Sequence, residues 1–236
     1  MAAVPPERRR RLRSFQPAGT ASLRGEEGAP LLDLASNDYL GLACHPTLQN
    51  AAATAIAREG VGAGASRLVC GGRAVHSELE QALAHWLGRE RVLLFPSGFQ
   101  ANLAAVAALA DRHSLVLADR LIHHSLLVGV KASGARLRRF PHNNLEALRE
   151  QLERARREAP GRRLLVLSES LFSMEGSSPD LPQLAELCRR HGAALLLDEA
   201  HALGVLGPGG RGLGHGQSGV SLISGTFGKA FGSGGA

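Results

Sequence analysis

The sequence predicts an α/β protein whose mostly parallel sheet is flanked by helices in three layers, α/β/α. Short apolar runs alternate along the chain with amphipathic stretches of helical period. A run that is apolar at every position indicates a strand buried on both faces, as in a parallel sheet covered by helices. The 236 residues, 44% of them hydrophobic and 20% charged, suffice for one large domain or two small ones.

The elements follow a regular order from Pro46 onward. The first 35 residues are rich in Arg, Gly and Pro and predict an arm with one short strand at 31–34. Amphipathic stretches then predict helices over 75–87, 100–110, 144–158 and 181–191. Buried strands are expected over 92–95, 115–118, 164–167, 194–197 and 222–224. We therefore divide the chain into an N-terminal arm, 1–45, and a large domain, 46–236.

The net charge of +6 does not by itself indicate a nucleic-acid partner. Most basic residues are arginines, in tracts interleaved with acidic residues at 8–13, 136–139, 154–163 and 189–190. This pattern favours solvated helix faces with charge pairs at helical spacing. Because no zinc-finger, RNA-binding or basic-zipper motif accompanies the arginines, we expect no nucleic-acid partner.

Cysteine usage and the N-terminus bear on the compartment. Cys44, Cys70 and Cys188 are too few and too scattered for a disulfide framework, and no pair has the C-x-x-C spacing of a structural zinc site. The first eleven residues lack the apolar segment of a secretion signal. No apolar run approaches the roughly 18 residues of a membrane span. We expect a cytoplasmic protein with no metal and no membrane partner.

Small and polar residues follow the first two strands, at the edge where parallel α/β sheets bind ligands. The turn that begins at Ser97 opens a helix, and a helix N-terminus suits a phosphate, although an ordinary turn capped by Ser97 explains the same residues. The pair His123–His124 can bind a metal, stack on a planar ligand or cap the next helix. Metal is the weakest of these, since no further ligand stands at suitable spacing.

The last two strands end in stronger signals. Asp198 closes the strand 194–197, and a buried carboxylate needs a cation or several donors. His201, three residues on, can face the same pocket. A P-loop nucleotide site is excluded because the chain lacks the G-x-x-x-x-G-K-[ST] motif. Lys229, one of only two lysines, lies in a turn of small residues, where burial lowers the pKa of an amine and suits it to imine formation.

Together these features are the parts of a pyridoxal phosphate (PLP) site. A helix start and Thr226 suit the phosphate, and His123 suits the face of the ring. Asp198 keeps the pyridine nitrogen protonated, so that the ring withdraws electrons, and Lys229 holds the aldehyde. The turn at Ser97 is a weak signal alone, and the order of all these parts along one parallel sheet is what predicts PLP.

The chain resembles the α-oxoamine synthases, which are fold type I PLP-dependent transferases. The motifs that carry the resemblance run in family order from residue 36 to the end: SNDYLGL at 36–42, GAGASR at 62–67, His76 with Leu79–Glu80, SGF at 97–99 with Ala101–Asn102, DRLIH at 119–123, FSMEG at 172–176, DEAH at 198–201 and TFGK at 226–229. The resemblance implies a PLP-binding large domain and a homodimer with active sites at the subunit interface.

The resemblance also implies roles for the matching residues. Catalytic roles fall on Lys229 as the imine lysine, Asp198 as the partner of the pyridine nitrogen, His201 near the 3-oxygen and His123 on the ring. Cofactor contacts fall on Gly98, Phe99, His123, Ser173, Asp198, His201, Thr226 and Lys229. For the substrate, the resemblance implies contacts with His123 and with an arginine of the arm, for which Arg11 is the best match.

The reaction that the resemblance implies is the decarboxylative condensation of L-alanine with pimeloyl-CoA, or the carrier-protein thioester, in biotin synthesis. The stretches 138–143, 172–176 and 198–201 favour this branch over sister enzymes that use glycine or serine: 2-amino-3-ketobutyrate CoA ligase, 5-aminolevulinate synthase and serine palmitoyltransferase. Family members continue past the position of Ala236 into a smaller C-terminal domain. The resemblance therefore implies a truncated chain, and a catalytically silent remnant is a second alternative.

Overall fold

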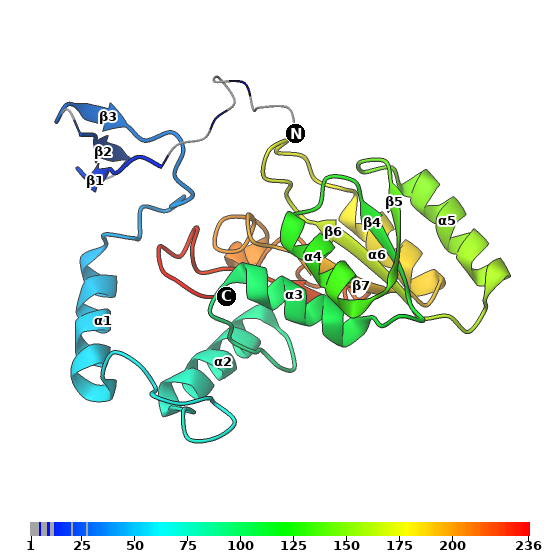
Figure 1. The fold of residues 1–236 in the computed structure, drawn as a ribbon, viewed down its shortest axis with the longest axis horizontal. Coiled ribbons are helices and arrows are strands. Elements are labelled where there is room, and N and C mark those ends of the chain that lie inside the picture. The colour runs from blue at the N-terminus through cyan, green and yellow to red at the C-terminus, as the bar shows by residue number, and fades with distance from the viewer. Residues whose placement is uncertain (1–4, 6–8, 10–11, 20, 27) are drawn as a thin grey trace.

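The computed structural model describes residues 5, 9, 12–19, 21–26 and 28–236 (Figure 1). Arg11, the expected substrate contact of the arm, lies outside the described residues. The elements follow in the order β1 (Gln16–Pro17), β2 (Ser22–Arg24), β3 (Pro30–Leu32), α1 (Pro46–Glu59), α2 (Ala74–Leu87), α3 (Gly98–Leu109), β4 (Leu115–Asp119), α4 (His124–Ser133), β5 (Arg136–Phe140), α5 (Leu145–Glu158), β6 (Leu164–Glu169), α6 (Leu181–Arg190), β7 (Ala194–Asp198), a 3-10 turn (Pro208–Gly210) and β8 (Leu222–Ser224).

The main sheet has five parallel strands in the order β5-β4-β6-β7-β8. The chain builds toward one edge from β4 to β5 and toward the other from β6 to β8. The direction therefore reverses between β4 and β6, and in such sheets a crevice for ligands opens at the carboxyl ends of the strands beside the reversal. The fold class predicted from the sequence is confirmed.

Helices cover both faces of this sheet, as Figure 1 shows. On one face, α5 and α6 pack on Leu115 and Leu117 of β4 and on alternate residues of β6 and β7. On the other face, α3 and α4 pack on Val116 and Ala118. Because successive side chains of a strand point to opposite faces, both sets must be apolar, which explains the unbroken apolar runs.

Two expected features of this region are wrong. The tract 136–139 is the edge strand β5 and not a helix face; Arg138 on it pairs with Glu158 of α5 at 2.8 Å. The segment 92–95 is extended but is not a strand. In the described part of the chain, its backbone hydrogen bonds to another segment are the two between Phe95 and Ala236. A strand requires a longer series of such bonds.

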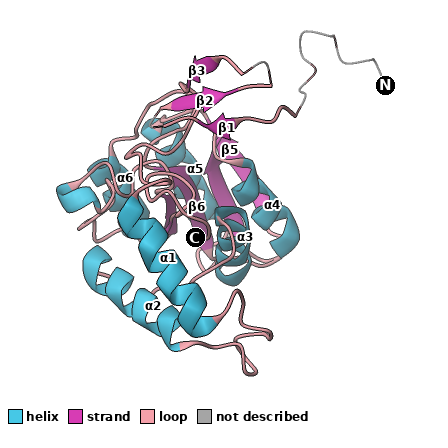
Figure 2. Cartoon of the chain, turned by 90° about the vertical axis from the view of Figure 1, so that its left-hand side faces the viewer, coloured by secondary structure: helices cyan, strands magenta, loops and turns pink. Residues whose placement is uncertain are grey.

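The N-terminal strands β1 to β3 form a small antiparallel sheet apart from the main one (Figure 2). Strand β3 confirms the short strand expected near 31–34, shifted by one or two residues. None of the residues of α1 is buried. No helix among the described residues is long and apolar enough to cross a membrane.

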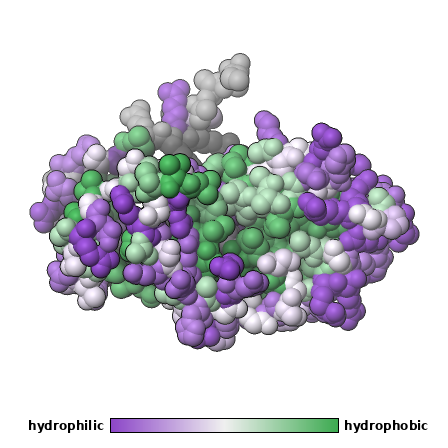
Figure 3. Space-filling model, turned by 90° about the horizontal axis from the view of Figure 1, so that it is seen from below, coloured by the Kyte–Doolittle hydropathy of each residue, from purple (hydrophilic) through white to green (hydrophobic). Residues whose placement is uncertain are grey.

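A broad apolar surface occupies the middle of one face of the molecule, between two polar ends (Figure 3). In the loop after α1, the side chains of Val61, Leu68 and Val69 are also strongly exposed, at 93%, 97% and 81%. Exposed apolar surface of this extent is typical of an interaction surface.

Candidate active site

The candidate site lies at the carboxyl ends of β6, β7 and β8. The register of the sheet sets Glu169 beside Asp198, and Asp198 beside Ser224, so the last residues of three adjacent strands form a row. All three side chains are buried. The pairing register sets these residues side by side although the strands differ in length, and it brings two carboxylates together in the interior.

Asp198 is 6% exposed and is held by two donors. Its Oδ2 accepts a hydrogen bond of 2.7 Å from the Nδ2 of Asn102 on α3, and its Oδ1 accepts one of 2.9 Å from the backbone N–H of Ala200. Asp198 is thus a buried, hydrogen-bonded carboxylate at the edge of the sheet where parallel α/β proteins bind ligands.

His123 follows β4 at the start of α4, and its side chain is exposed. Its backbone N–H donates to Oε1 of Glu169 at 2.6 Å, which anchors the loop to β6. Its Nδ1 lies 2.7 Å from the Oγ of Ser125 and caps the first turn of α4. The capping role considered from the sequence is confirmed, and it leaves the ring available to a ligand.

Lys229 and His201 face each other after β8 and β7. The Nζ of Lys229 lies 2.5 Å from Nε2 of His201, and the Nδ1 of His201 lies 2.7 Å from the hydroxyl of Tyr39. Burial lowers the pKa of Lys229, against the opposing effect of Asp198 and Glu169. Burial, and then the charge of Lys229, lower the pKa of His201 to about 4. The pair is therefore a neutral imidazole beside an amine that is unusually ready to lose its proton.

Glu169 has the most unusual environment of the cluster. Burial, followed by repulsion from Asp198, raises the pKa of its carboxyl to about 8, although the N–H of His123 and the charge of Lys229 act in the opposite direction. With a pKa of about 8, the carboxyl of Glu169 holds a proton at neutral pH.

A cradle of small residues and backbone groups adjoins these side chains. Ser97 caps α3 by accepting the N–H of Gln100 at 3.3 Å, and the N–H groups of Gly98 and Phe99 have no acceptor among the described residues. A Cβ on Gly98 would lie 3.6 Å from the Cβ of Thr226. The start of α3 and Thr226 therefore border one space, in which free donors suit an anion.

Sequence reasoning missed several members of this site. Asn102, Ser125, Glu169 and Tyr39 join the expected residues, and Tyr39 and Asn102 stand inside motifs that had drawn attention without a role. The signal of Asn102, Ser125 and Glu169 was polarity at buried positions, which only burial itself reveals. Tyr39 is 44% exposed and joins the site through its contact with His201. Ser173 is exposed in the loop after β6, and no hydrogen bond connects it to the cluster in the described part of the chain.

Glu199, next to Asp198, serves the scaffold. Its carboxylate is buried and accepts hydrogen bonds from the hydroxyl of Ser170 at 2.6 Å and from the N–H groups of Leu213 at 3.2 Å and Gly214 at 2.6 Å. Burial raises the pKa of this carboxyl. Glu199 thereby fastens the glycine-rich loop after β7 to the end of β6.

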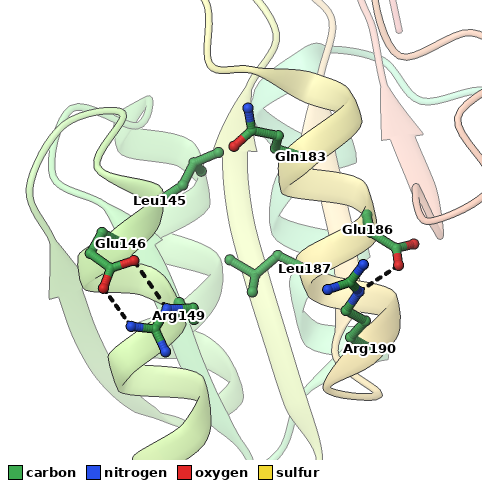
Figure 4. Close-up of a pocket in the computed structure, with 7 residues that line it drawn as sticks. All are labelled: Leu145, Glu146, Arg149, Gln183, Glu186, Leu187 and Arg190. Carbon is green, nitrogen blue, oxygen red and sulfur yellow. Dashed lines mark hydrogen bonds and ion pairs between the residues drawn. The ribbon is translucent and has the colours of Figure 1, made fainter.

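A separate hollow of about 370 Å³ lies between α5 and α6 (Figure 4). Its charged side chains satisfy one another within each helix: Arg149 pairs with Glu146, and Arg190 pairs with Glu186 at 2.6 Å. The hollow lies on the layer away from α3, so it is not part of the candidate site.

The fold is that of the fold type I PLP-dependent transferases. The chain belongs to the aminotransferase class I and II family, whose model matches residues 29–236. PLP is the cofactor of this family, in agreement with the cofactor expected from the sequence.

Curated relatives are named 8-amino-7-oxononanoate synthase. The one from Acidithiobacillus ferrooxidans is 46% identical over 230 residues, covering 94% of this chain and 58% of the relative. The one from Methylococcus capsulatus is 48% identical over 214 residues, covering 89% of this chain and 54% of the relative. The chain thus spans little more than half the length of the curated relatives it matches.

Solved structures agree with the fold. One is serine palmitoyltransferase from S. paucimobilis with bound PLP and myriocin, with a TM-score of 0.89 at 29% identity. The match covers 94% of this chain and 56% of the palmitoyltransferase chain. An 8-amino-7-oxononanoate synthase from Francisella tularensis has a TM-score of 0.68 at 30% identity, covering 85% of this chain and 56% of its own.

Proposed function

We propose that this chain binds PLP at the candidate site and carries the cofactor-binding part of an 8-amino-7-oxononanoate synthase. The observation that carries the proposal is the convergence of Lys229, with its lowered pKa, on His201 beside the buried carboxylate of Asp198. The fit is chemical: an amine for the aldehyde, a carboxylate for the pyridine nitrogen, and free N–H groups for the phosphate. Asn102 Oδ1 and Ser224 Oγ are also buried there without a partner.

When bound, PLP supplies an aldehyde that reacts with amines and a ring that withdraws electrons from them. The chain's own residues would hold it in a defined way. Lys229 would bind the aldehyde carbon, and Asp198 would keep a proton on the pyridine nitrogen. The amides of Gly98 and Phe99, with Thr226, would bind the phosphate, and Ser173 would lie at the rim.

Proton movement in the site would centre on Lys229. A lysine whose pKa is lowered by burial has a larger neutral fraction near pH 7, and a neutral amine accepts a proton from a substrate carbon. His201 would hold the Nζ of Lys229 in place and contact the cofactor's 3-oxygen. His123, with its exposed ring, would cover the cofactor and contact the amino-acid substrate. Arg11 would contact the acyl substrate.

For the whole protein we propose the condensation of L-alanine with pimeloyl-CoA, or with the carrier-protein thioester, to 8-amino-7-oxononanoate, CO2 and the free thiol. The names of the curated relatives support this reaction. The high TM-score to serine palmitoyltransferase favours a second candidate, a sister condensation that uses serine. Both use the same cofactor residues, so the amino acid must be determined by experiment.

We also propose a homodimer in a reducing, cytoplasmic setting. The exposed Val61, Leu68 and Val69, and the unburied helix α1, support a subunit interface on the N-terminal side. The free thiols of Cys44, Cys70 and Cys188 support the setting. Light scattering on the purified chain measures its molecular mass in solution. The mass of a monomer at micromolar concentration would contradict the proposed dimer.

The absorption spectrum tests the cofactor site. PLP is added to the chain and to two variants, Lys229→Ala and Lys131→Ala, and borohydride is then added. We expect a visible band in the parent chain and in Lys131→Ala, its absence in Lys229→Ala, and cofactor mass fixed on the peptide that contains Lys229. Equal bands in both variants, or cofactor fixed on Lys131, would overturn the proposal.

The same band reports on the amino acid. L-alanine, glycine and L-serine are added separately to the PLP-loaded chain. L-alanine is expected to change the band at the lowest concentration. A response to L-serine at lower concentration than to L-alanine would favour the sister condensation instead.

A further inference from the structure

Asn102 of α3 connects two residues of the candidate site: Asp198 at the end of β7 and Ser125 in the first turn of α4. Its Nδ2 donates to Oδ2 of Asp198 at 2.7 Å and to Oγ of Ser125 at 2.9 Å. Asn102 is 3% exposed and Ser125 is fully buried. The opposite orientation of the amide would set its oxygen against the carboxylate, so the direction of these bonds is fixed by charge.

The direction of the next bond follows from the first. Both hydrogens of the Asn102 amide are used, so Ser125 Oγ accepts one of them and its own O–H is free to donate. The nearest acceptor is Nδ1 of His123, at 2.7 Å, and the backbone N–H of Ser125 also donates to this nitrogen, at 3.3 Å. His123 Nδ1 is therefore an acceptor, and the proton of the neutral ring is on Nε2.

The backbone of His123 is fixed separately. Its N–H donates to Glu169, whose strand position is paired with that of Asp198. The ring and the backbone of His123 are thus both tied, by different routes, to the same pair of carboxylates. A rotation of the ring or a change of tautomer would break at least one of these bonds.

The Oδ1 atom of Asn102 is buried without a partner. A buried acceptor without a donor lowers stability, and an apolar side chain of the same shape would avoid the loss. A residue selected only for packing between α3 and the sheet would not keep this amide. Its two donor bonds are the feature that requires asparagine.

We propose that Asn102 and Ser125 are positioning residues of the PLP site: Asn102 holds the carboxylate of Asp198, and through Ser125 it holds the ring of His123 as the tautomer protonated on Nε2. This rests on the proposed function in so far as Asp198 and His123 contact PLP. The exposed Nε2–H of His123 is then a fixed donor toward the ligand space, suited to an acceptor such as a substrate carboxylate.

Nitrogen NMR of the chain without PLP tests the tautomer directly. Long-range proton–nitrogen correlations of His123, assigned with His123→Gln, are recorded for the parent chain and for Ser125→Ala. Ser114→Ala is the matched control, because its hydroxyl is equally buried but bonds to Asp111 at the other end of β4. We expect a single Nε2–H tautomer in the parent and the control, and a mixture of tautomers in Ser125→Ala.

The PLP dissociation constant is the second readout. We expect Asn102→Leu and Ser125→Ala to raise it on the order of tenfold, the effect of losing one hydrogen bond to a charged or coupled group, while Ser114→Ala leaves it unchanged. Circular dichroism shows whether each variant folds; should Asn102→Leu unfold, Ser125→Ala alone decides.

Two results would overturn the proposal. One is a parent chain in which His123 carries its proton on Nδ1. The other is a folded Ser125→Ala that keeps the parent's tautomer and the parent's PLP affinity. Failure of the parent to bind PLP would count against the proposed function instead, and the tautomer measurement would still decide the role of Ser125.

Discussion

The Nζ of Lys229 lies 2.5 Å from the Nε2 of His201, across 28 positions of the sequence. A lysine ammonium has no acceptor, so it donates to the imidazole, and the proton of the neutral ring is then on Nδ1. That proton points to the Tyr39 hydroxyl at 2.7 Å, which in turn donates to Oδ1 of Asn37 at 3.2 Å. One directed chain of hydrogen bonds therefore connects the arm to the lysine.

Replacing Tyr39 by Phe should lower the pKa of Lys229 further. Without the tyrosine oxygen, Nε2 of His201 is no longer held as an acceptor, and a hydrogen bond that favours the charged amine is lost. The pH dependence of amine modification at Lys229 measures this shift, with Lys131 as the internal reference. A Tyr39→Phe profile that overlays the parent would show that Tyr39 does not act through His201.

His201 should make the fold less stable in mild acid. Its pKa is about 4 in the folded chain and near 6.5 when unfolded, so between these values the unfolded state binds more protons. Stability is lost as the pH falls from 6.5 to 4. The variant His201→Gln should show a flatter dependence of melting temperature on pH across this window, with His191→Gln, at the residue that follows α6, as the control. Parallel curves for His201→Gln and the parent would contradict the assignment.

Glu169 should have the opposite dependence. Its pKa is raised to about 8 in the folded chain, so between pH 4.5 and 8 the folded state binds more protons than the unfolded one, and stability falls as the pH rises through this range. Glu169→Gln keeps an acceptor for the N–H of His123 without a charge. It should stabilise the chain by on the order of 3 kcal/mol at pH 8 and have little effect at pH 5. Unfolding in urea at both pH values measures the difference, and equal effects at the two would contradict the prediction.

Gly129 should be required where α3 and α4 cross. A Cβ added there would lie 2.9 Å from Cβ of Val106 and 3.2 Å from Cα of Leu103, so the helices would have to separate. We expect Gly129→Ala to destabilise the fold by about 1–3 kcal/mol. Gly161→Ala, with nothing within 4 Å of the added atom, is the control for the same change. A melting temperature for Gly129→Ala equal to that of this control would show that the helices adapt without loss.

Sequence patterns predicted the buried part of the fold better than its edges. The unbroken apolar runs of β4, β6 and β7 and the amphipathic period of α5 and α6 identified those elements within one or two residues. Strand β5 was missed because its arginines are typical of an exposed helix face. An edge strand is also exposed on one side, so exposure did not separate the two. Helix α4 was missed because its N-cap His123 and its first residues, His124 and Ser125, drew attention as a ligand loop.

The sequence by itself determined which chemical groups stand at the strand ends, because strand, turn and helix follow from local composition. It thereby determined Asp198, His201 and Lys229 as candidates. Only the tertiary structure decided which groups meet. Tyr39 reaches His201 across 162 positions and Asn102 reaches Asp198 across 96, through the register of the sheet and the packing of α3 on it. Such pairings depend on distances between elements, which no local pattern contains.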